Sequence, residues 1–341
     1  MKATIREISR QTGFSPATVS NALSGKRSVN AETSRQILKT AGELGYFETA
    51  PASRPKIRLV FFQADETIAY TSAFSSLIKG VEQESDRVGY EVTFHYLQRG
   101  SSSFVRQIKM LEETPQTAVV LVGNELTDED FSCFESLSSP TVLIGYWRAG
   151  LRQSAVLPDF EMAASLTAGY LTAKGHQRIG HLQNRYHSTV TEMLEYWYKR
   201  EFEHRNLMFG NSDTIPLDPG LESSYRSMLQ YLEQKRALPS AFVADSDEIA
   251  LGAMKALQEK GIRIPADVSV IGFGDLPFAQ IVSPGLTTIS FSHEEIGIQS
   301  VKILTSQISQ PDASPMRVMV TPKLVKRGSV QDLHSLSESP A

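Results

Sequence analysis

The sequence predicts an α/β protein in which a three-helix head precedes a larger body that contains two parallel sheets. Residues 4–44 hold three short helical segments that are separated by turn residues. From residue 57 onward, apolar runs alternate with amphipathic helices in two successive series. Strands that alternate with helices form parallel sheets covered on both faces, and two series indicate two lobes.

Length and composition narrow the class of protein. A chain of 341 residues with 41% hydrophobic residues is too long for one small domain and is typical of a globular protein. No apolar run is long enough to cross a bilayer, and the N-terminal stretch lacks the apolar core of a signal peptide. We therefore expect a cytoplasmic protein without a membrane partner. The single cysteine, Cys133, fits a reducing compartment, and we expect a buried small hydrophobic residue rather than a reactive thiol.

Charge is distributed unevenly along the chain. Residues 1–58 contain ten Lys and Arg against four Glu, a formal charge of +6, so the remainder carries −10 within the net −4. A basic head on an acidic body indicates a polyanionic partner. A solvated basic surface is the alternative, and charge alone does not separate the two.

Local signals place the first two helices of the head. The first covers about residues 4–11, and Gly13 ends it. Ser15 is suited to cap the second helix because its hydroxyl accepts a free backbone N–H. Pro16 then occupies the first helical position, where no N–H is needed, and the helix stops at Ser24-Gly25.

The second helix has two distinct faces. One face is apolar and is expected to pack on the first helix; it consists of Val19, Ala22 and Leu23. The other face is small and polar, without long charged side chains; it consists of Ala17, Ser20, Asn21 and Ser24. A third helix covers about residues 31–44, between the cap Asn30 and the stop Gly45, with an inward stripe of Ile37, Leu38, Ala41 and Leu44.

Three short helices with a tight glycine turn between the first two predict a helix-turn-helix. The outer face of the second helix has short side chains and therefore fits the major groove, where base edges differ chemically. Asn21 on this face is suited to form hydrogen bonds with an adenine edge. Basic side chains around it are suited to hold phosphates; they are Lys26, Arg27 and Arg35. The alternative is a small three-helix packing unit without a ligand.

Residues 3–46 resemble the DNA-binding head of LacI/GalR-type bacterial transcription regulators. The resemblance includes the TVS core, the turn that follows Ser24, the V-x-x-x-T start of the third helix and the terminal LGY. It implies double-stranded operator DNA as a partner. The residues that match base-contacting positions are Pro16, Ala17 and Asn21, and those that match phosphate-contacting positions are Thr4, Ser15, Thr18 and Ser20.

Residues 51–57 join the head, residues 1–50, to the body, residues 58–330. In the family, this segment usually forms a short helix on DNA and wedges a leucine into the minor groove. Here it is shorter, contains Pro51 and Pro55, and has no leucine. We therefore expect an extended linker in place of a helix.

The body shows the strand–helix alternation in detail. Predicted strands cover 57–62, 90–96, 117–123 and 140–146 in the first series, and 177–182, 240–244 and 267–273 in the second. Predicted helices cover 72–88, 103–113, 128–137, 160–174, 189–206, 219–235 and 246–260. A ligand is expected in the crevice outside the carboxyl ends of the strands.

The body resembles a periplasmic-binding-protein-like sensor, most specifically over the stretch that runs from Asp245 to Ile289. The resemblance implies that the chain crosses between the lobes about three times. The first lobe is then expected at about 58–157 and 289–317, and the second at about 158–288 and 318–330. Residues 331–341 are expected to form a disordered tail.

Two carboxylates are candidates for contact with a small effector. Asp275 follows a predicted strand and matches a family position that bonds ligand hydroxyls, so the resemblance implies a sugar or similar polyol. Asp247 matches a neighbouring acidic position. The alternatives are a turn role for Asp275 and a helix cap for Asp247.

Four aromatic residues are further candidates for the effector site. Phe74 matches an aromatic that lines the first lobe, Tyr70 precedes it in a loop, and Tyr146 and Trp147 follow a predicted strand. Packing is the alternative for each. Many relatives carry an arginine where Leu194 stands here, so an apolar or aryl-glycoside ligand, or no small ligand, stays open.

Other function classes find little support in the sequence. The stretch GFGDLP lacks the third glycine of a dinucleotide loop, and there is no P-loop, no G-x-S-x-G motif and no zinc spacing. His176 and His181 are expected to be structural. We therefore expect no catalysis, no cofactor and no metal. A transporter's solute-binding protein would need a signal peptide and no DNA-binding head.

The sequence therefore predicts a repressor that binds a pseudo-palindromic operator as a homodimer, because one helix-turn-helix contacts only a few base pairs. An effector between the lobes, expected to be a carbohydrate, would control it. The alternative is a DNA-binding regulator with a ligand-blind body that a partner protein controls.

Overall fold

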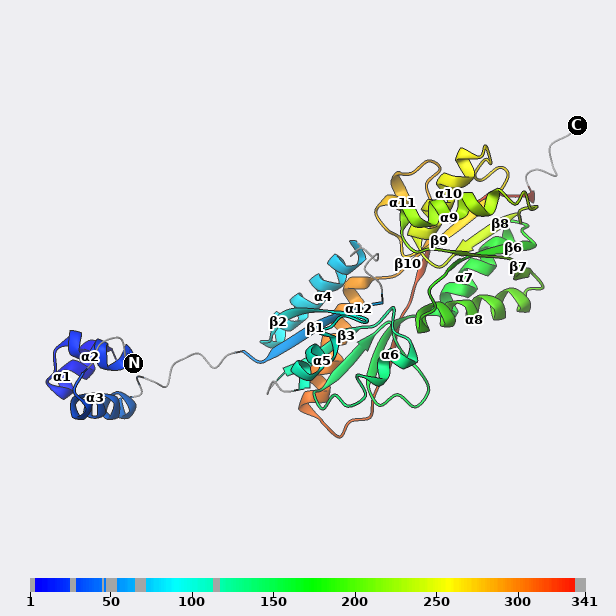
Figure 1. The fold of residues 1–341 in the computed structure, drawn as a ribbon. Coiled ribbons are helices and arrows are strands. Elements are labelled where there is room, and N and C mark those ends of the chain that lie inside the picture. The colour runs from blue at the N-terminus through cyan, green and yellow to red at the C-terminus, as the bar shows by residue number, and fades with distance from the viewer. Residues whose placement is uncertain are drawn as a thin grey trace, which may run out of the picture. The chain divides into compact units, whose positions relative to one another are not determined.

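In the computed structural model of the chain, the described residues are 4–24, 29–44, 46, 54–64, 72–112 and 117–334. The chain divides into two compact units, residues 1–54 and 55–341 (Figure 1). The second unit begins earlier than the predicted linker ends, because Lys56 and Ile57 already form the start of strand β1, Lys56–Gln63. Residues 51–53 of the predicted linker lie outside the described residues.

The first unit consists of three helices, α1 (Ile5–Thr12), α2 (Pro16–Ser24) and α3 (Ala31–Glu43). Each begins where a side chain caps it: Thr4 accepts from Glu7 N–H, Ser15 from Thr18 N–H, and Asn30 from Glu32 N–H. Gly13 ends α1 in the left-handed region at φ 75°. The predicted starts of α2 and α3 and the glycine stop of α1 are confirmed.

The core of the head is small. Ile8, Val19, Ile37 and Ala41 are fully buried, and Ala22, Leu23 and Leu44 are among the residues that pack against them. Leu38, predicted to face inward, is 42% exposed. Ile37 and Ala41 are four residues apart and share one stripe of α3, whereas Leu38 lies about 100° around the helix from Ile37. Gly45 lies outside the described residues.

The first sheet of the body has the strand order β11-β5-β4-β3-β1-β2, and its described pairings are parallel. Its strands after β1 are β2 (Glu91–Gln98), β3 (Thr117–Val122), β4 (Thr141–Ile144), β5 (Ser154–Pro158) and β11 (Arg317–Val320). The helices of this lobe are α4 (Ser72–Val88), α5 (Phe104–Glu112), α6 (Asp128–Ser132) and α12 (His293–Ser309). We call this unit of sheet and helices lobe 1.

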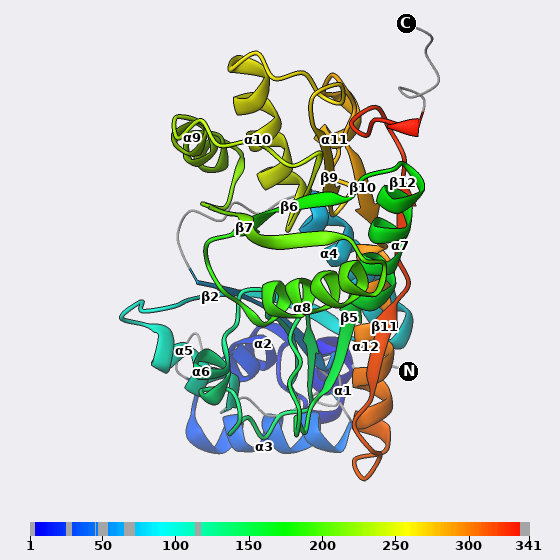
Figure 2. The ribbon, with the colours of Figure 1, turned by 90° about the vertical axis from the view of Figure 1, so that its right-hand side faces the viewer.

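The second sheet has the order β12-β10-β9-β8-β6-β7, with only β12 antiparallel to its neighbour among the described pairings. Its strands are β6 (Arg178–Asn184), β7 (Met208–Leu217), β8 (Ala241–Ala244), β9 (Ser269–Phe273), β10 (Thr287–Ser290) and β12 (Lys323–Val325). Its helices are α7 (Phe160–Ala173), α8 (Thr189–His204), α9 (Leu221–Leu232), α10 (Asp247–Glu259) and α11 (Phe278–Ile281). This unit is lobe 2, and Figure 2 shows the two lobes one above the other.

The chain crosses between the sheets after β5, after β10 and after β11. The predicted lobe boundaries at 288/289 and 317/318 are wrong by a few residues. Ile289 and Ser290 still belong to β10 of lobe 2, and Val318–Val320 pair with β5 of lobe 1. Helix α12 therefore lies in lobe 1 although it follows a lobe 2 strand, as its orange ribbon beside α4 and β3 shows (Figure 1).

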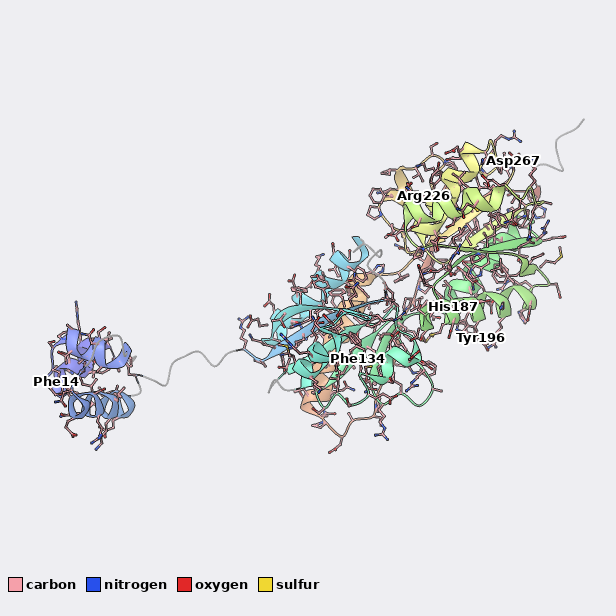
Figure 3. All side chains as sticks on the ribbon, in the orientation of Figure 1. Phe14, Phe134, His187, Tyr196, Arg226 and Asp267 are labelled. Atoms are coloured by element: carbon pink, nitrogen blue, oxygen red, sulfur yellow. The ribbon has the colours of Figure 1, made fainter. Side chains whose placement is uncertain are left out.

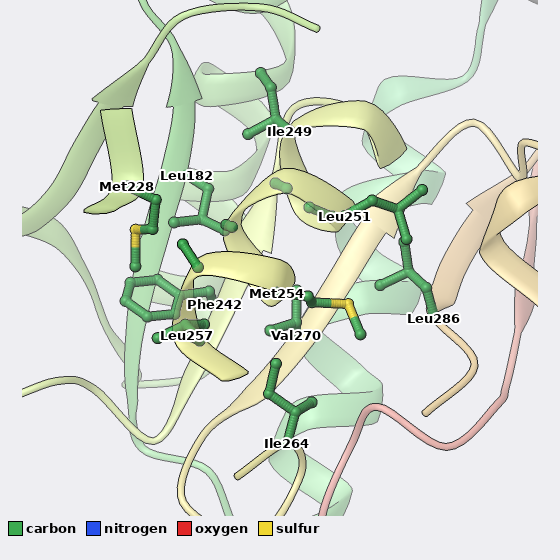
Figure 4. Close-up of a cluster of buried hydrophobic side chains, with 14 of the residues drawn as sticks. Leu182, Met228, Phe242, Ile249, Leu251, Met254, Leu257, Ile264, Val270 and Leu286 are labelled. Carbon is green, nitrogen blue, oxygen red and sulfur yellow. The ribbon is translucent and has the colours of Figure 1, made fainter. Parts of the chain in front are cut away.

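Lobe 2 has a continuous apolar core beneath α10. Figure 4 shows Ile249, Leu251, Met254 and Leu257 of this helix facing side chains of the neighbouring sheet and helices, among them Phe242. Asp247, the first residue of α10, is also fully buried. The packing of α10 therefore fixes the position of its N-terminal turn, which reaches the candidate site described below.

Two predictions for the body are wrong. Residues 331–334 are ordered rather than part of a disordered tail: Gln331 N–H donates to Ser269 Oγ at 2.9 Å, and Lys174 pairs with Asp332 at 2.7 Å. Residues 335–341 lie outside the described residues. Cys133 is exposed rather than buried, because it caps the short helix α6 while Phe131 and Phe134 take the inward positions around it.

Helices α4 and α12 cross at very short range within lobe 1. A Cβ atom at Gly80 would lie 2.1 Å from the carbonyl oxygen of Glu294, and one at Gly297 would lie 2.4 Å from the carbonyl oxygen of Leu77. Lys79 and Glu294 add an ion pair of 2.9 Å across the same crossing. The N-terminal turn of α12 is therefore held against α4 by backbone contact.

We predict that Gly80→Ala lowers the free energy of unfolding of the body by about 1–3 kcal/mol, because the new methyl group meets backbone that has little room to move. Gly169→Ala is the matched control: no atom lies within 4 Å of its Cβ position in α7. At position 169, alanine should raise the free energy of unfolding by about 0.5–1 kcal/mol. Urea unfolding of both variants measures this, and equal effects of the two substitutions would contradict the close crossing.

Candidate functional site

The exposed face of α2 is the candidate nucleic-acid interface. Ser15, Pro16, Ala17 and Ser20 are exposed, whereas Thr18 and Asn21 are half-buried. Thr4 is exposed before α1, and Arg35 is exposed on α3, 3.1 Å from Glu32. The structure therefore leaves Ala17 and Ser20 of the small polar face of α2 exposed, with the fully buried Val19 on the other side of the helix. Lys26 and Arg27 lie outside the described residues.

A cleft of about 440 Å³ lies between the lobes, a size within the range for small-molecule sites. Its lobe 1 lining includes the ends of β3, β4 and β5 and the starts of α4 and α12. Its lobe 2 lining includes the ends of β6, β8 and β9 and the starts of α7, α8 and α10. His187, labelled in Figure 3, lines it from lobe 2, on the side that faces lobe 1. The cleft thus occupies the carboxyl ends of both parallel sheets.

A row of aromatic rings lines part of the cleft. The ring centroids of Phe160 and Phe273 are 6.1 Å apart, those of Phe273 and Phe291 5.3 Å, and those of Phe291 and His293 4.5 Å. Phe160 begins α7 just after the first crossing, and Phe291 lies in the second crossing and packs against the cores of both lobes. Burial lowers the pKa of His293 to about 4, so its ring is neutral near pH 7. Phe160 and Phe273 are buried, so the half-buried Phe291 and His293 form the uncharged part of this row that a ligand can contact.

A close backbone approach positions one polar group of the cleft. Gly145 has φ 73°, and a Cβ atom there would lie 1.6 Å from the Asn124 side-chain oxygen. Both residues line the cleft, one after β3 and the other after β4. Because residue 145 has no Cβ atom, the side-chain amide of Asn124 has room to lie over the end of β4.

Asp245 connects two strand ends at the edge of the cleft in lobe 2. Its carboxylate accepts from His181 Nε2 at 2.6 Å and from Asn184 N–H at 2.8 Å. The side chains of Asp245 and His181 are almost fully buried. This link ties the end of β6, and with it the lining segment from Asn184 to Ser188, to the end of β8.

The two arginines of the cleft are held by acids beside it. Arg99 makes a bidentate pair with Asp130, with N···O distances of 2.8 and 2.5 Å. Arg185 lies 2.9 Å from Asp218. Leu194, at the position where relatives carry an arginine, is buried in the lobe 2 core and does not line the cleft. The guanidinium groups of this cleft therefore come from positions that the sequence did not single out.

The cleft also contains two glutamates in different states. One carboxylate oxygen of Glu125 accepts the Ala64 N–H at 2.7 Å. Glu248, in the first turn of α10, is half-buried, and its carboxylate has no hydrogen-bond or ion-pair partner among the described residues. Burial, and to a lesser degree the neighbouring Asp247, raise the pKa of Glu248 above its usual value.

Phe74 is the only predicted effector residue that the described structure places in the lining of the cleft. Tyr146 is fully buried, donates its hydroxyl to Asp128 at 2.7 Å and stacks on Phe131. Trp147 is half-buried, packs against core clusters of both lobes and lies beneath the Arg317 guanidinium at 4.1 Å. Tyr146 and Trp147 therefore have packing roles, and Tyr70 lies outside the described residues.

The two predicted aspartates also lie outside the lining. Asp247 is fully buried and accepts from Thr288 Oγ1 at 2.5 Å and from Leu276 N–H at 2.7 Å. Burial raises its pKa to about 6. Asp275 has φ 55°, and its carboxylate pairs with Arg327 at 2.6 Å. The residue that reaches the cleft at the end of β9 is Gly274, one position earlier.

The described residues contain no group of three or more His, Cys, Asp or Glu that could hold a metal ion. Within the same residues, no helix is both long and apolar enough to cross a membrane.

Two family models match parts of the chain. Residues 4–48 match the family described as bacterial regulatory proteins, lacI family, and residues 168–330 match the periplasmic binding protein-like domain. The HTH-type transcriptional repressor PurR of Haemophilus influenzae (strain PittEE) is 28% identical over 342 residues, which covers 97% of this chain and 99% of that protein.

Two solved structures are similar to this chain along almost its whole length. A complex of the transcriptional regulator CelR with cellobiose has a TM-score of 0.72 at 21% identity and covers 96% of this chain and 100% of its own. The lac repressor dimer bound to operator and the anti-inducer ONPF has a TM-score of 0.72 at 22% identity and covers 97% and 100%. At these identities the likeness concerns the fold.

We predict that Asp247→Ala lowers the free energy of unfolding by about 2–4 kcal/mol, because two buried donors, the Thr288 hydroxyl and the Leu276 N–H, lose their acceptor. Asp312→Ala removes the same group from an exposed turn and should change stability by less than about 0.5 kcal/mol. Thermal or urea unfolding measures both. If Asp247→Ala lowers the free energy of unfolding no more than Asp312→Ala does, Asp247 does not anchor the end of β9.

Proposed function

We propose that this chain, whose residues 4–48 match the family described as bacterial regulatory proteins, lacI family, is a transcriptional repressor that binds a pseudo-palindromic operator as a homodimer and responds to a small molecule in the cleft. The observation that carries the proposal is the composition of the cleft, whose lining comes from both lobes and from the segments that join them. A ligand that touches both lobes favours the arrangement in which they close on it. Such a change alters the dimer and thereby the spacing of its two heads.

The head supplies specific DNA binding. The exposed face of α2 has short side chains that let the helix approach base edges in the major groove. One such head contacts only a few base pairs, so two heads on two half-sites are needed for useful affinity and specificity. PurR and the lac repressor are named as repressors, which supports this role.

The lining favours an uncharged ring compound as effector. Phenylalanine rings offer a face on which a sugar ring or a purine base can stack, and Asn124, Asn184 and His187 are polar groups beside them. We propose a carbohydrate, as the sequence predicts and as the cellobiose complex of CelR supports. A purine is the second candidate, favoured by the row of rings and by the likeness to PurR.

The test is fluorescence anisotropy of the full chain on a duplex from its own upstream region and on a scrambled duplex, at two salt concentrations. A panel of sugars and purine bases is then added. We expect specific binding that one compound changes by tenfold or more, since allosteric coupling is about 1–3 kcal/mol. Specific binding that no compound changes would favour the ligand-blind alternative, in which a partner protein controls the repressor.

We predict that Asn21→Ala weakens operator binding by about 1–3 kcal/mol and leaves binding to scrambled DNA unchanged, because a base contact contributes to specific binding alone. Gln36→Ala, an exposed amide on α3 of the same head, is the control and should change neither affinity. Equal losses on both duplexes would assign Asn21 to the phosphate backbone or to head stability.

A further inference from the structure

Three consecutive polar residues open α10, and each has a different environment. Ser246 caps the helix by accepting the Ile249 N–H at 3.2 Å. Asp247 points into the lobe 2 core toward Thr288 and the Leu276 N–H. Glu248 lines the cleft. Since the cap and the buried acid fix the first turn of the helix, the Glu248 side chain is presented to the cleft by a rigid element.

The carboxylates that line the cleft differ in their partners. Both oxygens of Asp245 accept hydrogen bonds, from His181 and from the Asn184 N–H. One oxygen of Glu125 accepts the Ala64 N–H. Glu248 has neither kind of contact among the described residues, although it is half-buried. It is therefore the acidic group of the cleft whose hydrogen-bonding capacity the protein itself leaves open.

An unpartnered, half-buried carboxylate lowers the stability of the folded state. Removing a carboxylate from water without replacing its hydrogen bonds is unfavourable. The raised pKa of Glu248 reports this, since it means that the folded protein disfavours the ionised form. A group that weakens the fold and faces a ligand-sized cleft is best explained by a ligand that supplies the missing donors.

The neighbouring strand end leaves room for such a ligand. Asp275 is withdrawn from the cleft by its pair with Arg327. Gly274 takes the lining position, and a Cβ atom there would have only Asp247 Oδ2 near it, at 3.9 Å. The end of β9 therefore contributes open space, and the acidic anchor in this part of lobe 2 comes from α10.

We propose that Glu248 anchors the effector, and that the effector is a ring compound with two adjacent hydrogen-bond donors directed at this carboxylate. Vicinal hydroxyls of a sugar and the N–H and amino edge of guanine share this chemistry. One carboxylate accepts two donors in parallel, while the half-buried Phe291 ring contacts a face of the ligand ring. The proposal rests on the proposed function, because it assumes that the cleft is the effector site.

The test measures ligand affinity by isothermal titration calorimetry and operator affinity by anisotropy, both with the full chain. One arm of the panel has the donor pair: glucose, cellobiose, guanine and guanosine. The other arm has similar rings without it: caffeine and fully O-methylated glucose. The variants are Glu248→Gln, Glu248→Asp and the control Glu233→Gln, which removes the same charge from an exposed position at the end of α9.

We expect the wild type to bind at least one donor-pair compound and neither matched compound. Glu248→Gln should weaken that binding by about 10- to 100-fold, the usual effect of losing hydrogen bonds to a charged group, and Glu233→Gln should leave it unchanged. Glu248→Asp keeps the charge and should bind with intermediate affinity. Without ligand, Glu233→Gln should bind the operator as tightly as the wild type does, and Glu248→Gln should melt no lower than the wild type.

Two outcomes would overturn the role of Glu248 and leave small-molecule control intact. In the first, Glu248→Gln and Glu248→Asp bind the effector as tightly as the wild type does. In the second, the wild type binds caffeine or the methylated sugar as well as their parent compounds. If the operator affinity of the wild type responds to no compound of either arm, the proposed function and this proposal fail together.

Discussion

The body depends on one topological constraint: two parallel sheets share a chain that crosses between them three times. Parallel strands point their carboxyl ends to one edge, so the loops of both sheets meet there and enclose the cleft. The first two crossings bring Pro158, Phe160, Phe291 and His293 into the lining. The same segments thus connect the lobes and contact the ligand space. A ligand bound there would contact the segments that connect the lobes.

The charged groups around the cleft differ in whether they have a partner within the protein. Arg99, Arg185 and Arg327 pair with Asp130, Asp218 and Asp275. The buried carboxylates of Asp245 and Asp247 are satisfied by backbone and side-chain donors and tie strand ends together. Glu248 differs from them because its unpartnered carboxylate adds nothing to the fold. Among the described residues, this contrast sets Glu248 apart from the charged groups that hold the architecture together.

Head and body meet different physical demands. The head has a core of four fully buried side chains and relies on caps at Thr4, Ser15 and Asn30 to begin its helices. Its outer face on α2 is kept small, because bulk there would prevent a close approach to base pairs. The body instead has large apolar cores and tightly crossed helices, as at Gly80 and Gly297, where close packing leaves little room for deformation.

The sequence by itself determined the features that local physics controls: the capped starts of α2 and α3, the glycine stop of α1, the helix-turn-helix and the alternation of strands and helices in two lobes. It did not predict the short strands β5, β10, β11 and β12, which have three to five residues each, or the helices α11 and α12. It also missed β7, which contains Gly, Asn, Asp and Pro and pairs through a shifted register. Only the tertiary structure decided which side chains reach the cleft. Asp247 is buried in the lobe 2 core, whereas its neighbour Glu248 lines the cleft. Gly274 lines the cleft, whereas its neighbour Asp275 does not. Their fates depend on partners 29 to 52 positions away, Leu276 and Thr288 for Asp247 and Arg327 for Asp275, which no local pattern encodes.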